Sequence, residues 1–198
     1  MEFQGSKPSV VRSIKQRDLL NIWLRAWAKN QRAPEIADFQ PDRIADEMAD
    51  LVFLSVVEEN GAQRFRIDDD GHRLADAFGA PGKGSYLDDY FGPKLAPTIM
   101  PVYRECAQRG LPAYTISMVK DVYDRDVAYE RLILPFSEGH SITRMMASLK
   151  TISDDGCFEI RNLMRGHDVI PEFNVRVIID RDLVQTRNSN IPDVVEFS

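Results

Sequence analysis

Histidine is the residue that most often serves as a metal ligand or a general base, but the three histidines of this sequence are arranged for neither role. His72, His140 and His167 are scattered, and no two have the three- or four-residue spacing that brings two ligands to one face of a helix. His72 follows an acidic run, where a solvated histidine at a helix start is the simpler interpretation. The sequence therefore predicts no metal site and no catalytic histidine.

Other catalytic motifs are missing as well. The glycine-rich run at residues 79–84 contains Lys83 but lacks the spacing of a phosphate-binding loop, and no predicted strand runs into it. The sequence has no Gly-x-Ser-x-Gly nucleophile elbow. The acidic clusters at 68–70, 88–89 and 154–155 fall at predicted element ends, where solvated capping carboxylates are expected. These patterns argue against an enzyme.

The two cysteines, Cys106 and Cys157, are too few and too far apart for a disulfide scaffold. We expect them to be thiols of a reducing compartment, which indicates a cytoplasmic protein. Cys106 lies on a predicted helix, where a buried and inert thiol is the usual state of an unpaired cysteine.

A ligand pocket is the remaining candidate site, because Met and Tyr side chains make an adaptable apolar wall with a few polar tips. A predicted long helix and two predicted strands supply such residues. The candidate pocket residues are Met100, Tyr103, Tyr114, Ile116, Met118, Arg131 and Met145. A closed core that holds no ligand is the alternative interpretation.

Arg131 is the most informative member of this set, because it stands in a mostly apolar strand between Glu130 and Leu132. A guanidinium that points inward is costly unless it meets a carboxylate of a ligand or of the protein. Placement on the outer face of the sheet is the alternative. The alternation of the strand leaves both placements open, since both sets of side chains are mixed.

The composition describes a globular protein of one domain with an extension. The chain has 198 residues, of which 43% are hydrophobic, and a net charge of -6. The acidic stretch 153–198 and the absence of a basic cluster make nucleic acid an unexpected partner. No apolar run is long enough to span a membrane, and the first residues do not resemble a signal peptide.

An amphipathic helix is predicted at residues 13–30, and it contains both tryptophans. Its apolar arc is broader than a surface helix needs. We therefore expect a homodimer interface formed by Leu20, Trp23, Leu24 and Trp27. The alternative is a helix that only docks on its own core.

The remaining elements indicate an α+β fold. Helices are predicted at residues 42–50, 70–78, 94–109 and, with a weaker signal, 158–164. A hairpin of strands 51–58 and 64–68 is predicted around Asn60-Gly61. Three long strands are expected at 113–123, 127–137 and 141–152, and a further strand at 174–180. Together they predict a five-stranded antiparallel sheet with helices on one face.

This layout resembles a PAS domain, and most closely the PAS-like family of alphaproteobacterial sensory proteins. The resemblance covers roughly residues 19–153 and includes the strand Glu-Arg-Leu-Ile-Leu-Pro-Phe-Ser at 130–137. Other matching elements are Trp-Leu-Arg at 23–25, Pro34, Pro41, the strand at 51–57, Arg-Phe-Arg-Ile at 64–67, Gly-His-Arg-Leu at 71–74, Phe78-Gly79 and Gly84. The acidic run at 68–70 departs from the family pattern and suggests that the second strand ends early.

The resemblance implies a domain organisation and limits the cofactors. Residues 1–12 are expected to form a flexible N-terminus, 13–50 a helical segment, 51–153 the PAS-like core and 154–198 a C-terminal extension. Haem is disfavoured because the helix at 94–109 has no histidine. Flavin photochemistry is disfavoured because Cys106 lies in Arg-Glu-Cys-Ala and not in Asn-Cys-Arg-Phe. No cofactor is predicted.

The resemblance also implies a function. We expect a non-catalytic sensory or regulatory module of bacterial signal transduction, which binds a small ligand, forms a homodimer and signals to a separate protein, since no output domain is visible. One alternative is a small cone-shaped α+β enzyme of the isomerase or dehydratase type, which needs a buried Asp or Glu opposite Tyr103 or Tyr114. The other is a protein-interaction module with a filled core.

Overall fold

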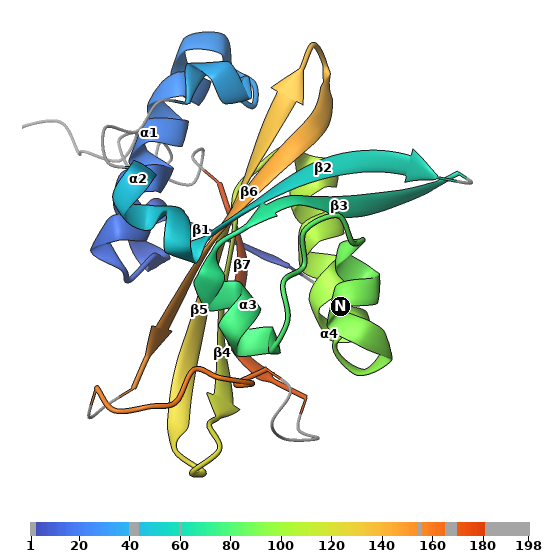
Figure 1. The fold of residues 1–198 in the computed structure, drawn as a ribbon. Helices are drawn as coiled ribbons and strands as arrows, with labels where there is room; N and C mark the ends of the chain where they lie inside the picture. Colours follow the sequence, from blue (N-terminus) through green and yellow to red (C-terminus); the bar gives the residue numbers. More distant parts are fainter. Residues whose placement is uncertain (1–2, 40–43, 60, 154–155, 165–169, 181–198) are drawn as a thin grey trace, which may run out of the picture.

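The computed structural model describes residues 3–39, 44–59, 61–153, 156–164 and 170–180 (Figure 1). Short 3-10 helices occur at Pro8–Val10, Ile36–Asp38 and Met48–Asp50. The helices are α1 Ile14–Asn30, α2 Ile44–Glu47, α3 His72–Phe78 and α4 Leu87–Arg109. The strands are β1 Gln4–Ser6, β2 Leu51–Glu59, β3 Ala62–Asp70, β4 Ala113–Lys120, β5 Asp126–Glu138, β6 Ser141–Ile152 and β7 Glu172–Ile179.

The sheet has seven strands in the order β1-β7-β4-β5-β6-β2-β3, so the prediction of five strands was incomplete. The five predicted strands form an antiparallel core, in which β2 pairs with both β3 and β6. Strand β7 adds to the open edge of β4, and β1 pairs with β7 in parallel, which makes the sheet mixed. Both added strands lie outside the predicted core and extend the same sheet.

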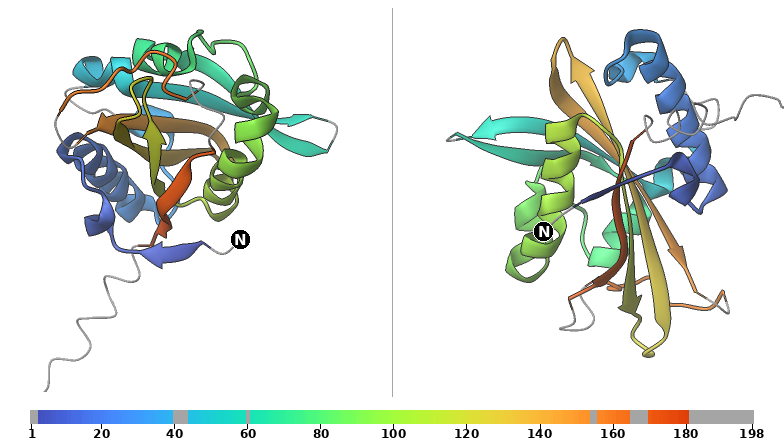
Figure 2. Two further views of the ribbon diagram at one scale, coloured as in Figure 1. Left: turned by 90° about the horizontal axis from the view of Figure 1, so that it is seen from below. Right: turned by 180° about the vertical axis from the view of Figure 1, so that it is seen from behind.

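Both faces of the sheet are buried, which corrects the expectation of helices on one face. Helices α3 and α4 pack on one face around Phe65, Phe78 and Ile133. Helix α1 packs on the other face around Trp23 and Phe136. Figures 1 and 2 show α1 and α4 on opposite sides of the strands. We refer to these as the α4 side and the α1 side of the sheet.

Helix α1 is held to its own sheet by its most buried residues. Ser13 caps the helix, as its hydroxyl accepts a hydrogen bond from the amide of Gln16. Trp23 is completely buried, and its indole Nε1 donates to the carbonyl of Pro135 at 2.7 Å. Leu20 is also buried. Leu20 and Trp23 therefore face the core of their own domain, and the homodimer interface that includes them stays a prediction.

Helix α4 starts at Leu87, earlier than the predicted residue 94, and contains a break at Gly92. Gly92 has φ 73°, a left-handed conformation that glycine adopts without a steric penalty. Pro93 follows the break and begins the second part of the helix, a position where a missing amide proton costs little. The break turns the aromatic residues Tyr90 and Phe91 into the core beside Phe78.

The two hairpin strands β2 and β3 are longer than predicted, because the acidic run does not end the second strand. Strand β3 continues to Asp70, whose carboxylate accepts hydrogen bonds from the amides of Gly82 and Lys83 at 2.8 and 3.0 Å. Asp68 pairs with Arg144 at 2.7 Å. Hydrogen-bond donors for the carboxylates thus offset the poor strand propensity of aspartate. Helix α3 consequently begins after Asp70.

The predicted helix at 158–164 was wrong. Residues 156–164 have no helix; Asn162 adopts a left-handed φ of 57°, which interrupts a right-handed helix. The segment instead covers α3, where the amide of Met164 donates to the carbonyl of Ala77 at 2.9 Å. At the N-terminus, β1 is hydrogen-bonded to β7, and Val11 is buried. The predicted strand at 174–180 corresponds to β7.

The difference between the two tryptophans gives a stability test of this arrangement. Trp23→Ala removes a buried indole and its hydrogen bond, so we expect the free energy of unfolding to fall by about 3–5 kcal/mol. Trp27→Ala serves as the matched control; Trp27 is half-buried, and we expect a loss of about 1 kcal/mol. Urea denaturation measures both. Equal losses would contradict the packing of α1 described here.

Candidate functional site

The structure divides the predicted pocket residues between the two sides of the sheet. Met100, Tyr103 and Met145 lie in the α4-side core. Tyr114 and Ile116 lie in the α1-side core, beneath α1. Met118 follows them at the same strand parity and is half-buried. The structure therefore does not bring the seven residues together as one wall.

Arg131 lies on the α4 side and is 2% exposed. Three aromatic rings surround its guanidinium, whose carbon lies 5.4 Å from the ring centre of Tyr129, 5.7 Å from that of Tyr103 and 5.9 Å from that of Phe91. Among the described residues, no carboxylate forms an ion pair with it, and its Nε atom has no hydrogen-bond partner. The inward placement considered from the sequence is the one adopted, and three ring faces stabilise the charge.

Two tyrosines next to Arg131 are neutral donors. Burial raises the pKa of Tyr129 to about 12, and the nearby positive charge of Arg131 opposes that rise. Burial raises the pKa of Tyr103 as well, again against the effect of Arg131. The hydroxyl of Tyr129 has no hydrogen-bond partner in the described part of the chain. A protonated phenol beside a guanidinium is suited to donate to an anion.

A small cavity of about 10 Å³ lies beside Tyr129, close to the space that one water molecule needs. Its walls come from α3, β5, β6 and residues 156–164. The lining residues are Asp50, Arg73, Leu74, Ala77, Tyr129, Leu149, Thr151 and Ile160. Asp50 and Arg73 therefore connect the α4-side interior to the charged cluster at its margin.

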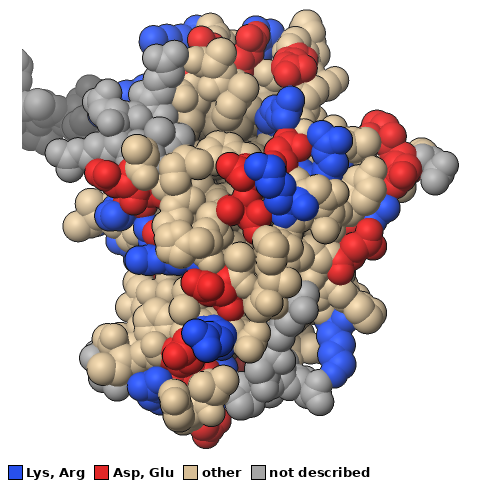
Figure 3. Space-filling model, in the orientation of Figure 1, with Lys and Arg blue, Asp and Glu red and all other residues tan. Residues whose placement is uncertain are grey.

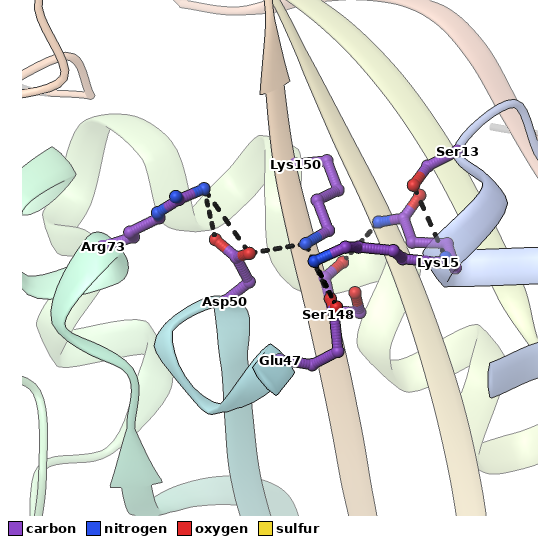
Figure 4. Close-up of polar contacts among 8 residues, drawn as sticks. Ser13, Lys15, Glu47, Asp50, Arg73, Ser148 and Lys150 are labelled. Carbon is purple, nitrogen blue, oxygen red and sulfur yellow. Dashed lines mark hydrogen bonds and ion pairs between the residues drawn. The ribbon is translucent and has the colours of Figure 1, made fainter. Parts of the chain in front are cut away.

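That charged cluster is a chain of alternating charges from Arg73 on α3 to Lys15 on α1 (Figure 4). Arg73 lies 3.2 Å from Asp50, and Asp50 pairs in turn with Lys150 on β6. Lys150 also pairs with Glu47 at 2.8 Å, and Glu47 pairs with Lys15 at 2.6 Å. We call these five residues the ion-pair chain. It links α1, α2, the 3-10 helix Met48–Asp50, β6 and α3.

The interior members of the ion-pair chain are well shielded from water. The side chains of Glu47, Asp50 and Lys150 are 8%, 6% and 12% exposed, so each needs its partners. Burial alone would raise the pKa of Glu47, but hydrogen bonds from Lys15 and Lys150 outweigh it and lower the pKa below its ordinary value of 4.5. This contribution to stability is present above that value and is lost as the pH falls through the folded-state pKa.

Sequence reasoning missed the ion-pair chain because its members are far apart in the sequence and sit on different elements. Lys150 carries the one usable signal, since it follows a run of apolar residues inside a predicted strand. A lysine at such a position needs an acidic partner. Nothing in the sequence identifies that partner as Glu47 or Asp50.

The other reactive residues do not form a site in the described part of the chain. Cys106 is completely buried, and burial raises the pKa of its thiol. No group of three His, Cys, Asp or Glu side chains is placed to hold a metal ion among the described residues. Within the same ranges, none of the helices combines the length and the apolar character needed to cross a membrane.

The surface shows no segregation of charge on the face drawn in Figure 3, where basic side chains stand beside acidic ones. Arg64 illustrates the pattern, because it pairs with Glu59, Asp88 and Asp89 at 2.8–3.0 Å. An open groove of about 730 Å³ lies between the ends of α1 and α4 and the β5–β6 turn, and Trp27 is part of its lining.

A family model described as PAS domain matches residues 11–150. No curated protein matches the sequence. A solved structure from work on a flavin analogue and the mechanism of light-oxygen-voltage domains is similar over 53% of this chain and 78% of that one, with 13% identity and a TM-score of 0.36. Because the family model spans more than half of the sequence, the chain belongs to the PAS domain family.

Proposed function

We propose that the chain is a non-catalytic sensory or regulatory module of signal transduction, which binds a small ligand on the α4 side of the sheet. The conformational change that the ligand causes is passed to α1, and the signal is then transmitted by contact with a separate signalling protein. Family membership and the enclosed polar groups around Arg131 support this proposal. The two cysteines are too few for a disulfide scaffold, and the proposed site of action is the cytoplasm.

The observation that carries the proposal is the ion-pair chain, because it joins the two sides of the sheet. Arg73 belongs to α3, which covers the α4-side interior, and Lys15 belongs to α1 on the opposite side. A ligand that displaces α3 also displaces Arg73 from Asp50. Asp50 then loses one of its two cationic partners and keeps Lys150. This change alters the ion pair of Lys150 with Glu47 and, through it, the pair of Glu47 with Lys15. Such a chain can shift α1 between two packings.

The enzyme alternative has one residue in its favour, which the sequence analysis did not single out. Glu130 is 1% exposed on the α1 side, and its negative charge contributes to the raised pKa of Tyr114, which burial dominates. However, neither the cavity beside Tyr129 nor the groove at Trp27 is lined by Glu130. The Tyr114 hydroxyl also accepts a hydrogen bond from the amide of Arg12 at 3.2 Å. A pair fixed beneath α1 supports packing better than turnover of a substrate.

The interaction-module alternative also has an observation in its favour, namely the small size of the cavity beside Tyr129. In that case side chains fill the α4-side core, and the protein acts only through contacts of its surface with other proteins. Retention of a ligand distinguishes ligand sensing from a pure interaction module.

The first test is mass spectrometry of the freshly purified full chain under native and then denaturing conditions. We expect an added small-molecule mass that is present in the native spectrum and lost on denaturation, because a ligand enclosed between α4 and the sheet dissociates slowly. A chain of bare mass in both spectra would contradict ligand sensing and favour the interaction module.

We also propose that the chain forms a homodimer, and the outer face of α1 offers a surface for this contact. Leu24 and Trp27 are half-buried, and Ile14 is 69% exposed. We expect Leu24→Ala combined with Trp27→Ala to convert a dimer into a monomer, measured by light scattering after gel filtration. Arg25→Ala, at an exposed position of the same helix, is the control and should keep the dimer mass. A double variant with unchanged dimer mass, or a monomeric wild type, would refute this interface.

A further inference from the structure

Several buried polar side-chain atoms on both sides of the sheet lack hydrogen-bond partners in the described part of the chain, and three of those on the α4 side lie on one patch. They are Nε of Arg131, the hydroxyl of Tyr129 and Oγ1 of Thr115. Thr115 is directly opposite Arg131 in the pairing of β4 with β5, and Tyr129 precedes Arg131 by two residues on the same face. All three residues are at most 2% exposed.

Such a patch is unusual for a folded protein, because buried donors and acceptors are nearly always paired. A guanidinium has five N–H donors and no acceptor. In Arg131 the Nε donor has no hydrogen-bond partner in the described chain. Hydroxyl groups of Thr115 and Tyr129 can turn their protons toward the same point. The three groups together therefore offer hydrogen-bond donors and a positive charge to a molecule that the chain itself does not supply.

The charges around the patch favour an anion. Asp50 is the acidic residue at the nearby cavity, and it is already paired with Lys150 and Arg73. In the pairing of β4 with β7, Thr115 is opposite a second arginine, Arg176, which stacks over Phe3 and Phe173 beside the edge strand β1. The negative charge of Glu105 acts on Arg176, but Glu105 is paired with Arg109. This row of the sheet therefore holds two arginines, while Asp50 and Glu105 are paired with other cations.

We propose that Arg131, Tyr129 and Thr115 form the recognition site for the carboxylate group of a small organic acid; this inference rests on the proposed function. A planar carboxylate matches the fork of a guanidinium, which binds two oxygens at once. The rings of Tyr103 and Phe91 beside Arg131 would contact the apolar body of the acid. An apolar setting of this kind fits a singly charged acid better than a multiply charged phosphate.

The cavity beside Tyr129 must enlarge to admit such an acid, and the residues of its walls indicate which element moves. Ile160 and α3 close the cavity, and α3 is covered by residues 156–164 through the hydrogen bonds of Asn162 and Met164 to Asp76 and Ala77. Outward movement of α3 makes room and moves Arg73 at the same time. Entry of the acid is thereby linked to the ion-pair chain.

Thermal unfolding of the full chain tests the site with acetate, butyrate and benzoate, each compared with its neutral amide at constant ionic strength. We expect at least one acid to raise the midpoint by several degrees while its amide leaves it unchanged. Arg131→Met should abolish that response and, without any acid, should melt at or above the wild-type temperature, because a buried unpaired charge is gone. Tyr129→Phe keeps the fold and should weaken the response.

The controls distinguish failure of this inference from failure of the proposed function. Arg104→Met, at an exposed position of α4, should respond to the acids as the wild type does. Amides that stabilise as strongly as acids would overturn the carboxylate assignment while leaving a ligand site in place. No response to any compound, together with an Arg131→Met variant that melts well below the wild type, would show that Arg131 is structural and would overturn the inference. A retained ligand in the native mass spectrum would still uphold the proposed function in that case.

Discussion

Lys150 is the residue on which the arrangement of this domain depends most. Its ammonium group is buried between two carboxylates, and neither it nor they are stable in that place alone. Glu47 ends α2 and Asp50 precedes β2, so the pairing fixes where the helical N-terminal segment enters the sheet. Lys15 of α1 pairs with Glu47, and Arg73 of α3 pairs with Asp50. Both helices are therefore linked to Lys150 on β6.

Buried hydrogen bonds fix α1 to the sheet. On the α1 side, Trp23 and Gln16 donate to the carbonyls of Pro135 and Ser148, which locks the helix in place. On the α4 side, Nε of Arg131 and the hydroxyl of Tyr129 have no hydrogen-bond partner in the described chain. The docked helix and the patch at Arg131 thus lie on opposite sides of the sheet, and the ion-pair chain is the link between them.

Local sequence signals predicted the elements well but not their partners. The hydrophobic period of α1 and the long central strands are local patterns, and they were confirmed. Which side Arg131 faces depends on the whole sheet, since its own strand carries mixed residues on both faces. For the same reason Tyr114 was grouped with Met145, although the sheet separates them. The edge strand β1 was missed because a strand of three residues, Gln4–Ser6, is too short to show a period.

Hydrogen exchange in Lys150→Met tests most directly whether the ion-pair chain couples the two sides. We predict faster amide exchange in both α1 and α3, and a free energy of unfolding lower by about 3 kcal/mol, since Glu47 and Asp50 lose their shared partner. Lys83→Met, which removes an exposed pair with Asp69, is the control and should change neither helix. Faster exchange near β6 alone, with α1 and α3 unchanged, would contradict the account.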